Sequence, residues 1–102
     1  MLELRPNCEM CDCDLPPDAD NARICTYECT FCARCVDEVL HNVCPNCAGG
    51  FVPRPIRPAM DRRPGVSRLH QPPGTKRRQL KYGLEDIKAL VAATKDIPPA
   101  KR

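Results

Sequence analysis

Apolar residues in the first fifty positions come in short clusters, and this pattern predicts several small elements rather than one long helix or strand. The run 24–27, Ile-Cys-Thr-Tyr, has the β-branched and aromatic residues typical of a strand. We expect it to pair with the segment around Phe31 as a short hairpin. Phe51 and Val52 predict one further short strand. These runs are too small to bury much surface, so the fold needs another source of stability.

Helical periodicity occurs twice along the chain. In the segment 35–40, three apolar residues recur at the i, i+3 and i+4 spacing, which predicts a helix of one to two turns: Val36, Val39 and Leu40. The segment 80–97 predicts a longer amphipathic helix with acidic residues in its first turn and one apolar stripe, formed by Leu80, Leu84, Ile87 and Val91. Both helices are marginal in isolation and need something to pack against.

Between the two helices the composition changes. All nine cysteines lie within residues 8–47, whereas eight of the twelve prolines lie at or beyond Pro53. Residues 53–79 are rich in proline and arginine and have no periodic apolar pattern, so they are predicted to be a largely disordered linker. The sequence therefore predicts a folded head over residues 1–52, this linker, and a C-terminal amphipathic helix over residues 80–97.

Charge divides the chain at the same place. Residues 1–50 carry three basic and nine acidic side chains, and residues 51–102 carry thirteen basic and four acidic ones. One interpretation is a basic tail that is solvated or folds back on its own acidic head. The alternative is an arm for nucleic acid or for an acidic protein surface. We favour the first, because the cations alternate with prolines and Tyr82 is the only aromatic residue near them that could stack on a base.

The N-terminal residues 1–7 contain neither the basic region nor the apolar region that a secretory signal needs. No run approaches the roughly 20 apolar residues that span a membrane. We therefore expect a cytoplasmic protein without a membrane partner.

The cysteines carry the clearest chemical signal. Eight of them form four closely spaced pairs, which are Cys8 and Cys11, Cys25 and Cys29, Cys32 and Cys35, and Cys44 and Cys47. Two such pairs complete a tetrahedral Cys₄ zinc site, so the sequence predicts two Zn²⁺ ions. Zinc would also supply the stability that so small a head lacks.

A disulfide framework and an iron–sulfur cluster are the alternatives to zinc. The expected reducing compartment and the odd number of cysteines favour metal over disulfides. The ninth cysteine, Cys13, is predicted to be a spare thiol in a loop, with exchange for another ligand or a redox role as the alternatives. Local spacing leaves open whether the four pairs interleave between the two ions or join in sequence.

The order and spacing of the pairs resemble the RING finger. Phe31 directly before the fifth of the eight paired cysteines, the short helix after the sixth, and Pro45 inside the last pair also match that family. The first 58 residues are also similar to small bacterial RING-like proteins described only as a domain of unknown function. The resemblance implies a cross-brace, in which pairs one and three share one ion and pairs two and four share the other. It assigns Cys8, Cys11, Cys32 and Cys35 to the first ion, and Cys25, Cys29, Cys44 and Cys47 to the second.

The resemblance also implies a function. RING domains bind other proteins through a shallow groove, which would here contain Met10, Val39 and Pro45. The sequence therefore predicts a small zinc-stabilised α+β domain of RING type that acts as a protein–protein interaction module. The alternative is a ubiquitin-like ligase that engages a conjugating enzyme, although Ala48 stands where active ligases often carry a cation. No catalytic triad, paired carboxylates or phosphate-binding loop is present, so intrinsic enzyme chemistry is not expected.

Overall fold

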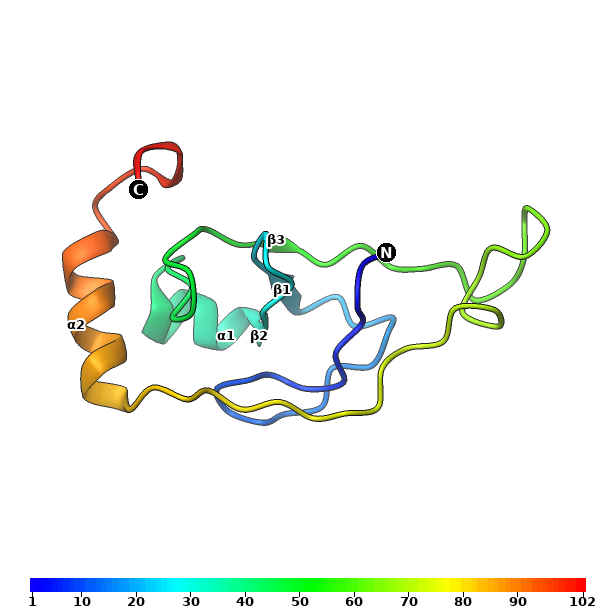
Figure 1. The fold of residues 1–102 in the computed structure, drawn as a ribbon, viewed down its shortest axis with the longest axis horizontal. Coiled ribbons are helices and arrows are strands. Elements are labelled where there is room, and N and C mark those ends of the chain that lie inside the picture. Colours follow the sequence, from blue (N-terminus) through cyan, green and yellow to red (C-terminus); the bar gives the residue numbers. More distant parts are fainter.

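A three-stranded antiparallel sheet lies at the centre of the head, and the computed structural model describes all of residues 1–102 around it (Figure 1). Its strands are β1 (Ala22–Ile24), β2 (Thr30–Cys32) and β3 (Val52–Pro53), in the order β2-β1-β3. Arg23 pairs with Phe31, and Ile24 pairs with Val52. The predicted hairpin and the predicted last strand are therefore both present. The first strand begins earlier than predicted and ends at Ile24.

A short helical stretch follows β2 directly. It consists of the helical turn α1 (Ala33–Cys35) and the π-helical segment η1 (Val36–Leu40). The sulfur of Cys32 accepts a hydrogen bond from the backbone N–H of Cys35 and so caps the helix start. Left-handed backbone at His41, with φ of 46°, ends the helix. The predicted helix is thus present, and a cysteine begins it.

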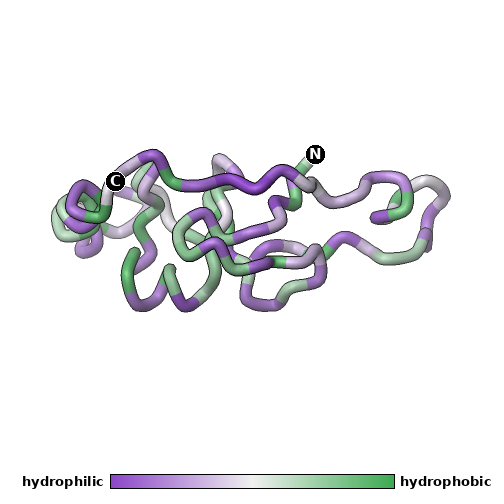
Figure 2. Tube along the Cα trace, turned by 90° about the horizontal axis from the view of Figure 1, so that it is seen from below, coloured by the Kyte–Doolittle hydropathy of each residue, from purple (hydrophilic) through white to green (hydrophobic).

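The core of the head is built largely from cysteine. Fourteen buried residues form one cluster, and six of these are cysteines. Phe31 is fully buried, and its ring meets that of Phe51 edge to face, with the centroids 5.4 Å apart. Hydrophobic stretches are short and alternate with hydrophilic ones along the trace (Figure 2). A core this small has little apolar area to hold it together.

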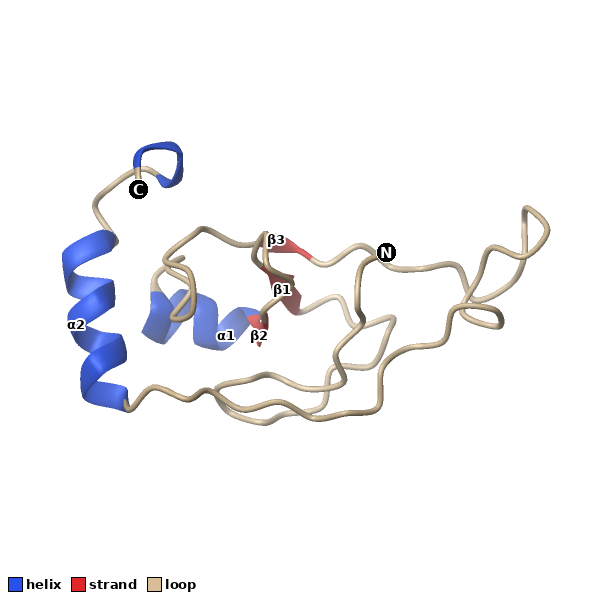
Figure 3. Ribbon diagram, in the orientation of Figure 1, coloured by secondary structure: helices blue, strands red, loops and turns tan.

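Residues 53–79 are ordered, and the prediction of a disordered linker was wrong. After β3 the chain runs outward, turns, and comes back beside the N-terminal residues (Figure 1). Gly74 N–H donates to the carbonyl of Leu4 at 2.9 Å, and Leu80 N–H donates to the carbonyl of Glu9 at 3.0 Å. We call residues 53–82 the return segment. Most of it has neither helix nor strand (Figure 3).

Two arginines explain why the return segment is ordered without an apolar pattern. The side chain of Arg54 is buried and donates to the carbonyls of Arg5, Leu15 and Pro16. Arg57 donates to the carbonyl of Leu2, 55 residues away. A segment with few apolar residues is predicted to be disordered because it has little apolar surface to bury. Here guanidinium groups that bind backbone carbonyls order the segment instead.

The helix α2 (Leu84–Thr94) crosses the end of the head and packs on η1 (Figure 1). Ile87 and Val91 are buried in the core cluster, as the predicted stripe requires. Leu84 was predicted in the stripe, yet it is 52% exposed. Thr94 is buried instead, so the contact face is rotated relative to the prediction. No helix of the structure is long and apolar enough to cross a membrane.

Beyond α2, the short 3-10 helix η2 (Pro99–Lys101) brings the C-terminus back to the head. The guanidinium of Arg102 donates to the carbonyl of Asn42 at 2.7 Å and to that of Ala48 at 3.1 Å. The C-terminal residues therefore contact the loop around the last cysteine pair.

Candidate metal centres

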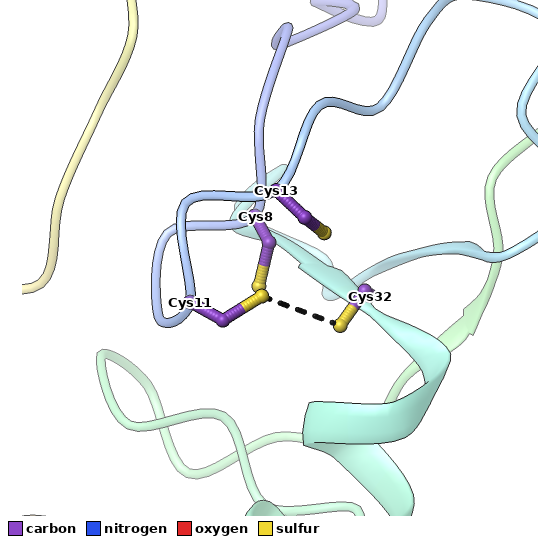
Figure 4. A group of neighbouring side chains, drawn as sticks. All are labelled: Cys8, Cys11, Cys13 and Cys32. Carbon is purple, nitrogen blue, oxygen red and sulfur yellow. Dashed lines mark hydrogen bonds between the residues drawn. The ribbon is translucent and has the colours of Figure 1, made fainter.

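Four thiols gather where the N-terminal loop meets β2. The sulfurs of this first cluster all lie within 4.8 Å of one another, and they belong to Cys8, Cys11, Cys13 and Cys32 (Figure 4). The sulfurs of Cys11 and Cys32 are 3.8 Å apart. The cluster thus joins the first cysteine pair to the third, and it includes the ninth cysteine, which was predicted to be a spare thiol in a loop.

A tight loop brings Cys8, Cys11 and Cys13 together. The N–H of Cys8 donates to the carbonyl of Cys13, and the N–H of Asp12 donates to the carbonyl of Cys8, both at 2.9 Å. Asp12 takes a left-handed conformation with φ of 64°, which turns the chain between the second and third thiols. Its carboxylate accepts a hydrogen bond from the amide of Asn7 at 2.9 Å.

Cys35 was predicted as a ligand of the same ion and lies at the margin of the first cluster. Its backbone N–H donates to the sulfur of Cys32 at 3.5 Å. Its thiol also interacts with the thiols of Cys32 and Cys11. Its sulfur is not among the four that are mutually within 4.8 Å. Five thiols therefore surround this site.

A second cluster forms where the hairpin meets the last cysteine pair. The sulfurs of Cys25, Cys44 and Cys47 lie within 4.8 Å of one another. The thiol of Cys29 hydrogen-bonds with those of Cys44 and Cys25, so it borders the same site. Backbone N–H groups point at two of these sulfurs, from Tyr27 to Cys25 at 3.3 Å and from Gly49 to Cys47 at 3.4 Å. Such N–H donors stabilise thiolates.

Left-handed residues shape the turns of the second cluster. Glu28 has φ of 66° and Ala48 has φ of 65°. The glycines that follow, Gly49 and Gly50, do not take this conformation. Ala48 takes it instead, and its N–H donates to the carbonyl of Cys44 at 2.7 Å.

The thiols of each cluster compete for protons. A hydrogen bond from the Cys44 thiol lowers the pKa of Cys29 to about 5, and the same bond together with burial raises the pKa of Cys44. Burial and the neighbouring Cys29 thiol raise the pKa of Cys25 to about 11. One thiolate thus forms easily in the second cluster, while further ionisation is opposed.

The first cluster behaves in the same way. Partial burial opposes ionisation of Cys11, yet hydrogen bonds from Cys13, Cys8 and Cys32 lower its pKa to about 7. Burial and the hydrogen bond with Cys11 raise the pKa of Cys13 to about 12. Burial also raises the pKa of Cys8. A divalent cation removes this repulsion, because it binds all the thiolates at once.

The dimensions of the clusters fit zinc. A tetrahedral site with Zn–S distances near 2.3 Å has sulfur atoms about 3.8 Å apart. The separation of Cys11 and Cys32 is 3.8 Å, and all nine cysteines are free thiols. Soft thiolate donors in a set of this size are the ligands that zinc prefers. The two clusters could therefore hold zinc ions.

The residues predicted to bind a partner are not equally accessible. Val39 is exposed on η1, and Met10 is half-buried where it packs against the core. Pro45 is buried, so it cannot present a contact surface. Met10 also lines a hollow of about 380 Å³ together with Leu84 and Ile87 of α2. The chain's own helix thus borders the predicted groove.

Comparisons with known proteins bear on the same part of the chain. Residues 1–57 match the family described as "Protein of unknown function (DUF1272)", which is more than half of the 102 residues. The chain belongs to this family. The DUF1272 match contains both cysteine clusters and ends before most of the return segment.

The chain is also similar to a curated protein of a bacterium. An uncharacterised protein of Rhizobium meliloti (strain 1021) is 64% identical over 59 residues, which are 58% of this chain and 70% of the relative. No solved structure matches the chain.

Two features of the site escaped the sequence analysis, and a third, the place of Cys13 in the first cluster, was only an alternative there. Arg5 and Glu9 form a buried ion pair at 2.9 Å, and Glu9 also accepts the N–H of Thr30 at 2.6 Å, which ties the first loop to β2. Arg77 binds the carboxylates of Asp12 and Asp14 on either side of Cys13. The contacts of Arg77 join residues more than sixty positions apart, and such contacts leave no local pattern in the sequence.

Proposed function

We propose that this chain binds two zinc ions in a cross-brace and acts as a small protein-interaction module of RING-like type. One ion is held by the first and third cysteine pairs, with Cys8, Cys11, Cys32 and Cys35 as the assigned ligands. The other is held by the second and fourth pairs, with Cys25, Cys29, Cys44 and Cys47. The observation that carries the proposal is the composition of the clusters. The first cluster joins the first cysteine pair to the third, and the second cluster joins the second pair to the fourth, so neither joins neighbouring pairs.

Zinc has a structural role in this proposal. Thiolates from the loop, the hairpin and the last pair meet at the ions, so metal binding closes the head around a core in which six of fourteen residues are cysteines. Structural sites in zinc-finger peptides contribute about 10–16 kcal/mol each. Four thiolates fill the coordination of Zn²⁺ and leave no position for a substrate. The chain therefore performs no metal chemistry of its own.

The interaction surface that we propose lies on η1 beside the two metal loops. Val39 is exposed there. The C-terminal residues lie along the same end of the head, since α2 packs on η1 and Arg102 binds the carbonyl of Ala48. A partner protein must bind beside these residues or displace them.

The ion pairs of the basic return segment favour binding to the chain's own head over binding to nucleic acid. Arg77 pairs with Asp12 at 2.9 Å and with Asp14 at 2.6 Å, and Arg78 lies 3.4 Å from the carboxylate of Glu3. The acidic head thus already neutralises these cations. We propose the segment as a strap that covers the head.

A photo-crosslinker placed in the full chain tests the interaction surface in cells. At Val39 it should give a discrete protein adduct, and removal of residues 83–102 should strengthen that adduct if α2 competes with the partner. The control position is the exposed residue Arg62, because the segment of residues 58–71 lies at the end of the molecule opposite to α2 (Figure 1). The same adduct at both positions, or none at Val39 in either chain, would contradict the proposed surface.

A further inference from the structure

The first site contains one thiol more than zinc can bind. We propose that Cys13 and Cys35 are interchangeable fourth ligands of the ion that Cys8, Cys11 and Cys32 hold. This inference rests on the proposed zinc function. It adds Cys13, which the cross-brace pattern leaves out, to the ligand set.

Cys13 meets the geometric requirement for a ligand. Its sulfur lies within 4.8 Å of those of Cys8, Cys11 and Cys32, so these four sulfurs are close enough together to bind one ion (Figure 4). Its carbonyl accepts the N–H of Cys8 at 2.9 Å, which fixes the backbone of Cys13 against the first ligand. This backbone hydrogen bond keeps the thiol near the site.

Cys35 reaches the same site from the helix. It is the last residue of α1, the helical turn that follows Cys32, and its thiol interacts with those of Cys32 and Cys11. The loop thus delivers Cys13, while the helix start delivers Cys35. Because a tetrahedral zinc ion takes four sulfurs, one of these two thiols is always left over.

Either thiol can remain unbound by the ion with little loss of free energy. Cys35 is 6% exposed within the core cluster, and a protonated cysteine packs there as a small apolar side chain. Cys13 is exposed, so its free thiol is hydrated when Cys35 binds. The two arrangements differ in which thiol is free and not in the number of Zn–S bonds.

The return segment holds Cys13 in reach. The guanidinium of Arg77 binds the carboxylates of Asp12 and Asp14, the residues on either side of Cys13, and also donates to the carbonyl of Asp12. This clamp spans more than sixty residues of sequence. Arg77 is therefore a positioning residue for the alternative ligand.

The second cluster provides a matched contrast. Cys25, Cys29, Cys44 and Cys47 surround it, and no fifth cysteine lies close by. Loss of one ligand there cannot be replaced by another thiol.

Native mass spectrometry of the zinc-loaded full chain tests the inference. We expect two zinc ions in the wild type, two in Cys13→Ser, two in Cys35→Ser and one in Cys13→Ser/Cys35→Ser. Cys44→Ser, the control at the site without a spare thiol, should retain one. A single zinc in either Cys13→Ser or Cys35→Ser, or two in the double variant, would overturn the inference. Fewer than two zinc ions in the wild type would instead contradict the proposed function.

Alkylation of the zinc-loaded protein gives a second readout that does not depend on metal count. Iodoacetamide should label Cys13 in the wild type, where Cys35 can replace it at the metal. In Cys35→Ser, Cys13 becomes an obligatory ligand and should be protected. Full labelling of Cys13 in Cys35→Ser at the wild-type rate would show that it does not bind the ion, and would overturn the inference.

Discussion

At the scale of single residues, the thiols of a cluster cannot all ionise near neutral pH unless a cation joins them. Adjacent thiolates repel one another, and hydrogen bonds between thiols favour one thiolate among protonated neighbours. In the second cluster Cys29 is the residue that ionises most easily, with a pKa of about 5, while the pKa of Cys25 is raised to about 11. Zinc binding therefore has to displace protons.

This competition predicts the pH dependence of zinc affinity. Cys25 and Cys44 both have pKa values raised by burial and by the Cys29 thiol, so both are protonated at pH 7 in the metal-free fold. Zinc binding at the second site should release at least two protons. For each proton released, the apparent zinc affinity falls about tenfold when the pH falls by one unit. Affinity should thus fall at least about 100-fold from pH 7 to pH 6.

Isothermal titration calorimetry measures this proton release. Zinc is titrated into metal-free protein in buffers of different ionisation enthalpy, and the heats give the number of protons released. Cys44→Ser loses the second ion, so it gives the protons released at the first site alone and serves as the comparison. An affinity that does not change between pH 6 and pH 7 would contradict the proposed thiolate ligation.

The buried Arg5–Glu9 pair is a second feature at this scale. The two side chains are 9% and 5% exposed, and burial lowers the pKa of Arg5, whereas Glu9 together with Glu3 and Cys29 raises it by more. Glu9→Gln leaves the buried Arg5 guanidinium with only the more exposed carboxylate of Glu3, at 3.6 Å, as a counter-charge. We expect the free energy of unfolding of the zinc-loaded protein to fall by about 3–5 kcal/mol.

Urea unfolding followed by circular dichroism measures that loss. The control is Glu38→Gln, since Glu38 is 67% exposed and lies 3.9 Å from Arg34 on the helix surface. An exposed pair of this kind contributes about 0–1 kcal/mol. Equal effects of the two substitutions would show that burial of the Arg5–Glu9 pair has no special role.

At the scale of elements, α2 depends on its contact with η1. An isolated helix of 11 residues is marginal in water, so burial of Ile87 and Val91 has to stabilise it. Ile87→Ala should cost about 2–5 kcal/mol and release the helix. Hydrogen exchange of the α2 amides measures the release. Leu84→Ala is the control, because Leu84 is 52% exposed on the same helix. Unchanged protection in Ile87→Ala would mean that α2 is held by other contacts.

Elements with a local signal could be predicted from sequence. The helix α2 follows from the recurrence of Ile87 and Val91, and η1 follows from that of Val36 and Leu40. Residue spacing likewise indicated that the cysteines form metal clusters. The rotation of α2 that exposes Leu84 depends on the shape of η1, and that shape is not encoded in the helix itself.

Features set by distant contacts could not be predicted. The order of the return segment depends on Arg54, which reaches carbonyls 38 to 49 residues away. The burial of Pro45 depends on how the chain folds over the last cysteine pair. Cys13 joins the first cluster because Asp12 turns the loop, and a left-handed aspartate has no pattern in the sequence.

At the scale of the whole molecule, the return segment acts as a strap on the head. Arg54 is 4% exposed, and burial lowers its pKa because no carboxylate compensates the loss of water. Three carbonyls share its guanidinium instead, from Arg5, Leu15 and Pro16. Hydrogen bonds to a charged group contribute about 1.5–3 kcal/mol each in buried positions. The strap should therefore fail when this arginine is removed.

Limited trypsin digestion tests the strap. In Arg54→Ala, cleavage after the downstream basic residues of the return segment should become at least tenfold faster than in the wild type. Arg62→Ala removes an exposed arginine and should leave the cleavage rate after Arg77 and Arg78 unchanged. If both variants are digested at the wild-type rate, Arg54 does not hold the segment.

The central claim is that two zinc ions are bound by interleaved cysteine pairs, and native mass spectrometry combined with alkylation of Cys44→Ser tests it most directly. We expect two zinc ions in the wild type and one in this variant, with Cys25 becoming reactive while Cys32 stays protected. If the pairs instead joined in sequence, loss of Cys44 would free Cys32 and leave Cys25 protected. That pattern, or fewer than two zinc ions in the wild type, would contradict the account.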